Sequence, residues 1–185
     1  MEVRRVKALR DAAQERAGPR LRTGRCMDRF LSNAVNRIDA KGRVSVPAHF
    51  RAVLQKRGFQ ELYALSALDV PAIDMGGLDL LDRYEARLGA EDPFLQTADD
   101  MSFFCHGDGA FVKVDAEGRF TVPDFIREHT GIASEVAFVG RGQFFQVWEP
   151  GRFAAHRREV RSRLLKLRQD LAEEARGKAG YGREA

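Results

Sequence analysis

The chain of 185 residues is long enough for one domain or two small ones, and 44% of its residues are apolar, which suffices for a core. No apolar run approaches the roughly eighteen residues of a membrane span, and the N-terminus lacks the apolar centre of a secretory signal. Two cysteines, Cys26 and Cys105, occur without CxxC spacing. They argue against a disulfide framework or a zinc site and indicate a reducing cytoplasm.

The formal net charge of +4 is divided unevenly along the chain. Residues 1–26 and residues 151–185 each carry +5, whereas residues 27–150 carry −6. Within that middle part, residues 29–57 hold seven basic residues against one acidic residue, and residues 58–111 carry −9. The basic block indicates a nucleic-acid partner, and a solvated basic face without a partner is the alternative.

Residues 1–26 form a basic N-terminal extension that we expect to be disordered apart from a short frayed helix around Val6–Arg16, which Gly18-Pro19 ends. Met27 opens a segment that leads directly into the first predicted strand. We therefore interpret Met27 as the natural start. The alternative is a genuine basic arm that helps to hold DNA.

One pattern occurs twice. Residues 36–51 read NRIDAKGRVSVPAHFR and residues 112–127 read VKVDAEGRFTVPDFIR. A repeat unit of about forty-five residues is too small to bury a good core alone, so we expect both copies to pack into one domain with approximate two-fold symmetry.

The first copy begins with a strand over Phe30–Ile38 and a turn at Ala40-Lys41-Gly42, where glycine supplies the left-handed backbone of a short hairpin loop. Alternation around Val44 and Val46 predicts the returning strand. A helix over Ala48–Lys56 and a strand over Leu62–Leu65 follow. In the second copy we predict strands at Phe111–Val114, Phe120–Val122, Val136–Val139 and Phe144–Trp148, and a helix at Phe125–Thr130.

Helices are also expected over Leu78–Leu88, Phe94–Phe104 and Arg152–Arg176, the last of them largely exposed because opposite charges are mixed along it. The predicted fold is α+β. We divide the chain into the extension, a first repeat at residues 33–80, a helical linker at 81–108, a second repeat at 109–152 and a C-terminal helix or tail at 153–185.

Asp39 and Arg43 lie on opposite arms of the first turn. The carboxylate can accept backbone N–H groups within the loop and can hold the guanidinium by a charge-assisted bond. Such a rigid tip exposes Lys41 and can enter a major groove, where an arginine can pair bidentately with guanine. The alternative is a hairpin brace without a ligand.

The second turn carries Glu117 where the first has Lys41. An acidic tip repels phosphate, which supplies much of the affinity of DNA-binding proteins. We therefore expect the first repeat to make most of the DNA contact, with Arg119 as a lesser contact of the second.

Enzyme chemistry is not indicated. The four histidines have no metal-ligand spacing, and the adjacent Cys105 and His106 are better explained by a buried structural thiol. Gly140-Arg141-Gly142 lacks the spacing of a phosphate-binding loop. We expect no catalytic residue, metal, cofactor or small-molecule substrate.

The doubled Asp-x-x-Gly-Arg motif with its x-x-x-Pro tail, together with the closing pattern of residues 139–148 (VGRGQFFQVW), resembles the MraZ family of tandem AbrB/SpoVT-type swapped-hairpin regulators over about residues 27–153. The resemblance implies interleaved hairpins in a small β-barrel, a ring-shaped homo-oligomer and binding to repeated operator boxes in double-stranded DNA. It also implies control, usually repression, of the division and cell-wall gene cluster that includes the family's own gene. The location implied is the cytoplasm, on the nucleoid.

The resemblance places the family's paired Asp and Arg on Asp39 and Arg43 and again on Asp115 and Arg119, and its basic tip residue on Lys41. The full candidate site combines these positions with the residues around the two turns. Residues expected to contact DNA are Arg37, Lys41, Arg43 and Arg119, and residues expected to shape the loops are Asp39, Gly42, Asp115 and Gly118. The stretch Leu68–Gly77 departs from the family pattern. Two alternatives remain, an AbrB-type antitoxin that wraps a partner with its tail over Arg152–Ala185, and a ring that binds protein and no DNA.

Overall fold

The computed structural model describes residues 28–59, 61–88 and 96–181. The basic extension over residues 1–26, its expected helix around Val6–Arg16 and Met27 lie outside the described residues. Within the described part, five α-helices accompany eight β-strands, and the paired strands run antiparallel. The predicted α+β class is confirmed.

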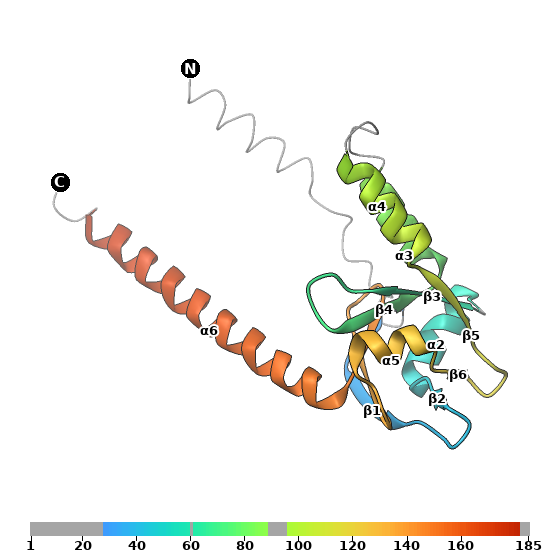
Figure 1. The fold of residues 1–185 in the computed structure, drawn as a ribbon. Helices are drawn as coiled ribbons and strands as arrows, with labels where there is room; N and C mark the ends of the chain where they lie inside the picture. Colours follow the sequence, from blue (N-terminus) through green and yellow to red (C-terminus); the bar gives the residue numbers. More distant parts are fainter. Residues whose placement is uncertain (1–27, 60, 89–95, 182–185) are drawn as a thin grey trace.

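Six strands form one sheet in the order β1-β7-β8-β4-β3-β5 (Figure 1). Their bounds are Asn33–Arg37 (β1), Glu61–Ser66 (β3), Ala72–Gly76 (β4), Ala110–Lys113 (β5), Glu135–Gly140 (β7) and Phe145–Trp148 (β8). The remaining two strands, β2 (Arg43–Ser45) and β6 (Arg119–Thr121), pair with each other as a separate ribbon. The six-stranded sheet is open, with β1 and β5 at its edges, so this pairing does not confirm a closed barrel.

The two repeats interleave through their strands. β1 of the first repeat pairs with β7 of the second, and β3 of the first pairs with β5 of the second. The registers match, because Arg37 lies opposite Glu135 in one pair and Lys113 lies opposite Glu61 in the other. Strand pairing thus follows the approximate two-fold symmetry that the repeated sequence predicts.

Two residue pairs lie on the axis of this symmetry. Val44 and Phe120 are equivalent residues of the two repeats, and they face each other in the β2–β6 ribbon. Asp74 of β4 and Gln146 of β8 are equivalent by their places in the β3–β4 and β7–β8 pairs, and they also face each other. The repeats therefore meet at the ribbon and at the centre of the sheet.

The helices α2 (Ala48–Arg57) and α5 (Asp124–Thr130) are equivalent and agree with the predicted bounds to within one residue. Each follows a proline, which has no N–H to leave unpaired at a helix start. Each ends at a glycine in the left-handed conformation, with φ of 76° at Gly58 and 78° at Gly131. Proline and glycine thus punctuate both helices in the same way.

The helix α3 (Leu78–Leu88) has the predicted bounds. α4 (Gln96–Gly107) ends three residues beyond the predicted Phe104, and the predicted start at Phe94 lies outside the described residues. These two helices pack side by side, and α6 (Pro150–Tyr181) extends away from the sheet (Figure 1). No helix in the described part of the chain combines the length and apolar character that a membrane span needs.

Two features of the strands differ from the sequence prediction. The predicted strand over Phe30–Ile38 is shortened to β1, because Ser32 adopts a positive φ of 73° and bends the chain after Phe30. β4 was not predicted. Its five residues are all buried, so it lacks the alternation of apolar and polar residues that reveals a strand with one exposed face.

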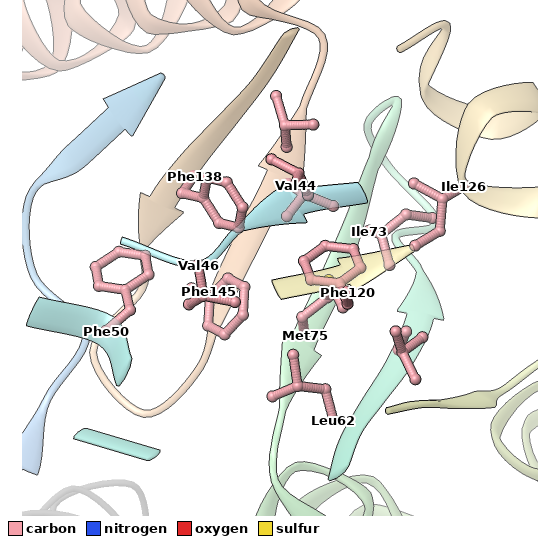
Figure 2. Close-up of a cluster of buried hydrophobic side chains, with 14 of the residues drawn as sticks. Val44, Val46, Phe50, Leu62, Ile73, Met75, Phe120, Ile126, Phe138 and Phe145 are labelled. Atoms are coloured by element: carbon pink, nitrogen blue, oxygen red, sulfur yellow. The ribbon is translucent and has the colours of Figure 1, made fainter. Parts of the chain in front are cut away.

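The main core draws on both repeats, as Figure 2 shows for side chains from β2, α2, β3, β4, β6, α5, β7 and β8. Phe145 is fully buried, and its ring lies 5.1 Å from that of Phe30, 5.3 Å from that of Phe50 and 6.0 Å from that of Phe138. Burial of an aromatic side chain of this size is worth roughly 1.5–3 kcal/mol. Because partners come from both repeats, neither repeat can bury these rings alone.

Candidate nucleic-acid interface

The first hairpin loop, Asp39–Arg43, is organised by one carboxylate. Asp39 Oδ1 accepts the backbone N–H groups of Lys41 and Arg43, each at 2.9 Å. Oδ2 accepts Nε of Arg43 at 2.9 Å and its Nη2 at 2.7 Å. Gly42, at φ of 76°, closes the turn by donating its N–H to the Asp39 carbonyl. The loop is therefore rigid, and the Arg43 guanidinium has a set orientation.

The same bonds hold the Asp39 carboxyl in its charged form. The side-chain hydrogen bonds from Arg43 and then the backbone bond from Arg43 lower the pKa of Asp39 to about 2. The carboxylate thus remains ionised and keeps its bonds to Arg43 across the neutral pH range.

The second loop, Asp115–Arg119, has the same backbone. Asp115 Oδ1 accepts the N–H groups of Glu117 and Arg119 at 3.0 and 2.8 Å, and Oδ2 accepts Nε of Arg119 at 2.9 Å. Arg119 Nη2 turns instead to Glu117 Oε2, at 2.8 Å. Bonding to Asp115, with the nearby Glu117, raises the pKa of Arg119. The charged Arg119 guanidinium is therefore paired with two carboxylates, whereas that of Arg43 is paired with one.

The tip of each loop differs in charge as the sequence predicted. Lys41 is exposed, and within the described residues its ammonium group is in no ion pair. Glu117 is exposed at the equivalent position and carries the opposite charge. From residue 37 to 43 the net charge is +2, and from residue 113 to 119 it is zero. The first loop is thus the more attractive one for a phosphate backbone.

Both loops project from the same side of the molecule (Figure 1). The β2–β6 ribbon joins their bases, because Val46 donates its N–H to the carbonyl of Gly118 and Val122 donates its N–H to that of Gly42, each at 2.9 Å. Arg43 and Arg119 open two antiparallel strands of only three residues. The structure therefore brings Lys41, Arg43 and Arg119 to one surface.

Arg37 lies at the end of β1, next to the first loop, and its side chain is 87% exposed. Its Nε donates to Glu135 Oε1 at 3.1 Å. An exposed ion pair of this kind contributes at most about 1 kcal/mol. Breaking this ion pair therefore costs little free energy, and Arg37 is available to bind a ligand.

The basic block over residues 29–57 is divided in the structure. Lys56 pairs with Asp28 at 2.6 Å and Arg57 pairs with Asp79 at 2.8 Å. These pairs lie at the C-terminal end of α2, and Arg29 lines the same small hollow. Part of the net charge of +6 over residues 29–57 is therefore offset by ion pairs within the fold, away from the hairpin loops.

Arg51 is a loop-supporting residue that the sequence analysis did not single out. It extends from α2 of the first repeat and donates Nη1 to the Glu117 carbonyl in the second loop, at 2.9 Å. The equivalent Arg127 donates instead to the Ala133 carbonyl of its own repeat, at 3.0 Å. The signal available in the sequence was an arginine at the same position of both repeat copies. It did not reveal that Arg51 bonds to the loop of the other repeat.

We predict that Gly118→Ala destabilises the protein more than Gly42→Ala. Both glycines have φ of 76°, which costs an alanine roughly 1–2 kcal/mol. A Cβ on Gly118 would also lie 2.1 Å from Cδ of Arg51, whereas the nearest atom to a Cβ on Gly42 is 3.8 Å away. Chemical denaturation should show the larger loss for Gly118→Ala, and the excess should vanish in an Arg51→Ala background. Equal losses in the wild-type background would contradict this explanation.

Cys105 and His106 form no catalytic pair. Cys105 is fully buried, as predicted, and its carbonyl accepts the Tyr63 hydroxyl. His106 is exposed and lies 3.1 Å from Glu85, which raises the pKa of the imidazole. Among the described residues no group of three or more His, Cys, Asp or Glu is placed to hold a metal ion.

The chain is similar to several bacterial proteins named "Transcriptional regulator MraZ". One from Rhizobium rhizogenes is 58% identical over 135 residues, which are 73% of this chain and 92% of that protein. One from Rhizobium meliloti is 56% identical over 135 residues, again 73% of this chain and 92% of that protein. One from Beijerinckia indica is 47% identical over 79% of this chain and 89% of its own. No protein-family model matches the chain. The names of these relatives describe regulators of transcription and no enzyme.

Proposed function

Since this chain belongs to the MraZ family of transcriptional regulators, we propose that it regulates transcription by binding double-stranded DNA at specific sites through its hairpin loops. The observation that carries the proposal is the first loop, where Asp39 orients Arg43 beside the exposed Lys41. An oriented guanidinium suits bidentate pairing with guanine, and a mobile ammonium suits phosphate.

We assign the contacts as follows. Arg43 reads a base edge, Lys41 and Arg37 contact phosphate, and Arg119 makes a weaker contact because two carboxylates compete for it. Asp39, Gly42, Asp115 and Gly118 shape the loops. Phosphate contacts position the protein, and the base contact supplies specificity.

The proposal extends to the assembly. Several chains form a ring in which interleaved hairpins complete a small barrel in each subunit, and the ring presents its first loops to evenly spaced operator repeats. The regulated genes are the division and cell-wall cluster with the protein's own gene, the usual effect is repression, and the location is the cytoplasm on the nucleoid. Linked weak contacts add through effective concentration, which explains the need for repeated boxes.

Titration of the full chain against the DNA upstream of its own gene tests this function. Fluorescence anisotropy should show preference for that DNA over random sequence by about 10³-fold or more. Reducing the operator to one repeat should lower affinity by far more than a proportional share. Equal affinity for upstream and random DNA would reject specific binding, and a monomer in light scattering would reject the ring.

A second function has a specific observation in its favour. Four leucines of α6 are at least half exposed, namely Leu164, Leu165, Leu167 and Leu171. Such apolar side chains on a protruding helix suit a protein partner, as an antitoxin tail or an interaction ring requires. Absence of specific DNA binding by the purified chain would favour a function that depends on a protein partner alone.

A further inference from the structure

A cavity of about 610 Å³ lies between the end of β3, the β3–β4 turn, β4, β8, α3, α4 and the first half of α6. No residue of the loops Asp39–Arg43 and Asp115–Arg119 lines this cavity, which plays no part in the site described above. Its volume is within the roughly 300–1,000 Å³ of small-molecule sites in proteins. Its lining has three chemically different parts, a polar floor, a basic mouth and an apolar wall.

The floor is the residue pair on the symmetry axis of the sheet. Asp74 and Gln146 are each only 6% exposed. Asp74 Oδ1 accepts Nε2 of Gln146 at 2.7 Å, and Oδ2 accepts the Tyr84 hydroxyl at 2.8 Å. Gln146 Oε1 in turn accepts Nε1 of Trp148 at 3.2 Å. Burial raises the pKa of Asp74, although these bonds and the charge of Arg141 oppose that shift. The floor is therefore a satisfied, rigid network.

The mouth is basic. Arg83 of α3, Arg141 of the β7–β8 turn and Arg163 of α6 line the cavity together with one exposed acidic residue, Asp69 of the β3–β4 turn, and all three arginines are exposed. Among the described residues, the guanidinium groups of Arg83 and Arg141 are in no ion pair, and Arg163 is 3.8 Å from Glu159. The three arginines outnumber Asp69, so the exposed part of the lining carries a net positive charge that an anion would offset. Guanidinium groups bind carboxylate, phosphate and sulfonate oxygens through paired N–H donors.

The wall is apolar. Leu80 of α3, Met101 and Phe104 of α4 and Phe144 beside β8 contribute side chains to it. Phe104 and Phe144 also pack with the buried Tyr63 and Leu65 in the second core cluster, so this wall is held in place. An aromatic or aliphatic body would bury its surface there without displacing a polar group.

We propose that this cavity binds a small amphipathic anion, with the acidic group held by Arg141 and Arg83 and the apolar body against Phe104 and Phe144. The mouth supplies the charge partner, the wall supplies apolar contact area, and the rigid floor limits the depth of entry. The inference does not rest on DNA binding, because the hairpin loops contribute no residue to the cavity.

The probe for the test is 1-anilinonaphthalene-8-sulfonate, an aromatic anion whose fluorescence rises in an apolar environment. Titration of the full chain should give saturable binding of one probe per chain. Arg141→Ala and Arg83→Ala should each weaken it about tenfold, as expected for loss of a charged hydrogen-bond partner. The matched control is Arg158→Ala. Arg158 is an exposed arginine of α6 that does not line the cavity.

A second probe separates charge recognition from general apolar binding. N-phenyl-1-naphthylamine has the same rings without the sulfonate, so it should bind more weakly. Its affinity should be unchanged by Arg141→Ala and Arg83→Ala. Equal loss of both probes in the variants, or equal binding of both to the wild type, would overturn the assignment of an anion. Sulfonate binding that disappears as the protein concentration rises would overturn it too, because a second copy of the chain would then cover the cavity.

Discussion

Arg43→Ala should abolish specific DNA binding and leave the fold intact. The guanidinium is fixed by Asp39 Oδ2 within the more basic loop, and loss of a bidentate base contact costs roughly 1–3 kcal/mol per site. In a ring the loss is repeated at every subunit that touches DNA, so this substitution has the largest expected effect on function. Anisotropy with operator and random DNA measures it.

The fold is expected to survive because the backbone of the loop does not depend on the Arg43 side chain. Asp39 Oδ1 would still accept the N–H groups of residues 41 and 43. The matched control is Arg119→Ala, which should weaken binding less because Arg119 is already paired with Asp115 and Glu117. A correctly assembled Arg43→Ala protein with wild-type affinity would reject the site. A larger effect of Arg119→Ala would mean that the second repeat, and not the first, makes the stronger DNA contact.

Removal of the exposed Asp39 charge provides a further comparison. In Arg43→Ala, Oδ2 of Asp39 loses its side-chain partner and presents an uncompensated charge to phosphate. Asp39→Asn combined with Arg43→Ala removes that repulsion. If the double variant remains unable to distinguish operator from random DNA, the lost specificity belongs to the Arg43 base contact and not to repulsion.

Glu117→Lys should raise the affinity for DNA and steepen its dependence on salt. The substitution gives the second loop the charge of the first and frees Arg119 from one of its two carboxylates. Each new phosphate contact adds about 0.9 to the slope of log K against log salt concentration. In an assembly of several chains this gain is multiplied, and both operator and random DNA should be bound more tightly.

The control for this prediction is Glu173→Lys, which makes the same change in net charge at an exposed position on α6. Long-range attraction alone would increase affinity equally in the two variants. A larger increase in affinity and slope for Glu117→Lys is expected if the second loop faces the DNA. Equal increases would show that this loop lies away from it.

The local parts of the fold and of the candidate site could be predicted from sequence. The helices α2 and α5 were located by a proline before them and a glycine after them, and α3 by its apolar face. The loop chemistry was also predictable, because Asp39, Gly42 and Arg43 all lie within five residues. β4 was missed because its buried residues show no alternation and three of the five are Ala, Asp and Gly, which are uncommon in strands, whereas the equally buried β8 is rich in aromatic and β-branched residues. Its counterpart β8 was predicted, so the repeat itself held the missing signal.

What the sequence by itself determined is therefore the turn in each repeated motif, the ends of α2 and α5 and the charge difference between Lys41 and Glu117, because these depend on neighbours a few residues away. The tertiary structure decided which segments meet. It interleaved the strands of the two repeats, placed Arg51 against the opposite loop, and paired Lys56 and Arg57 with distant carboxylates. It also assembled the cavity from strands, helices and turns spread between residues 66 and 163. Those outcomes follow from packing and register between remote parts of the chain, to which no short pattern is sensitive.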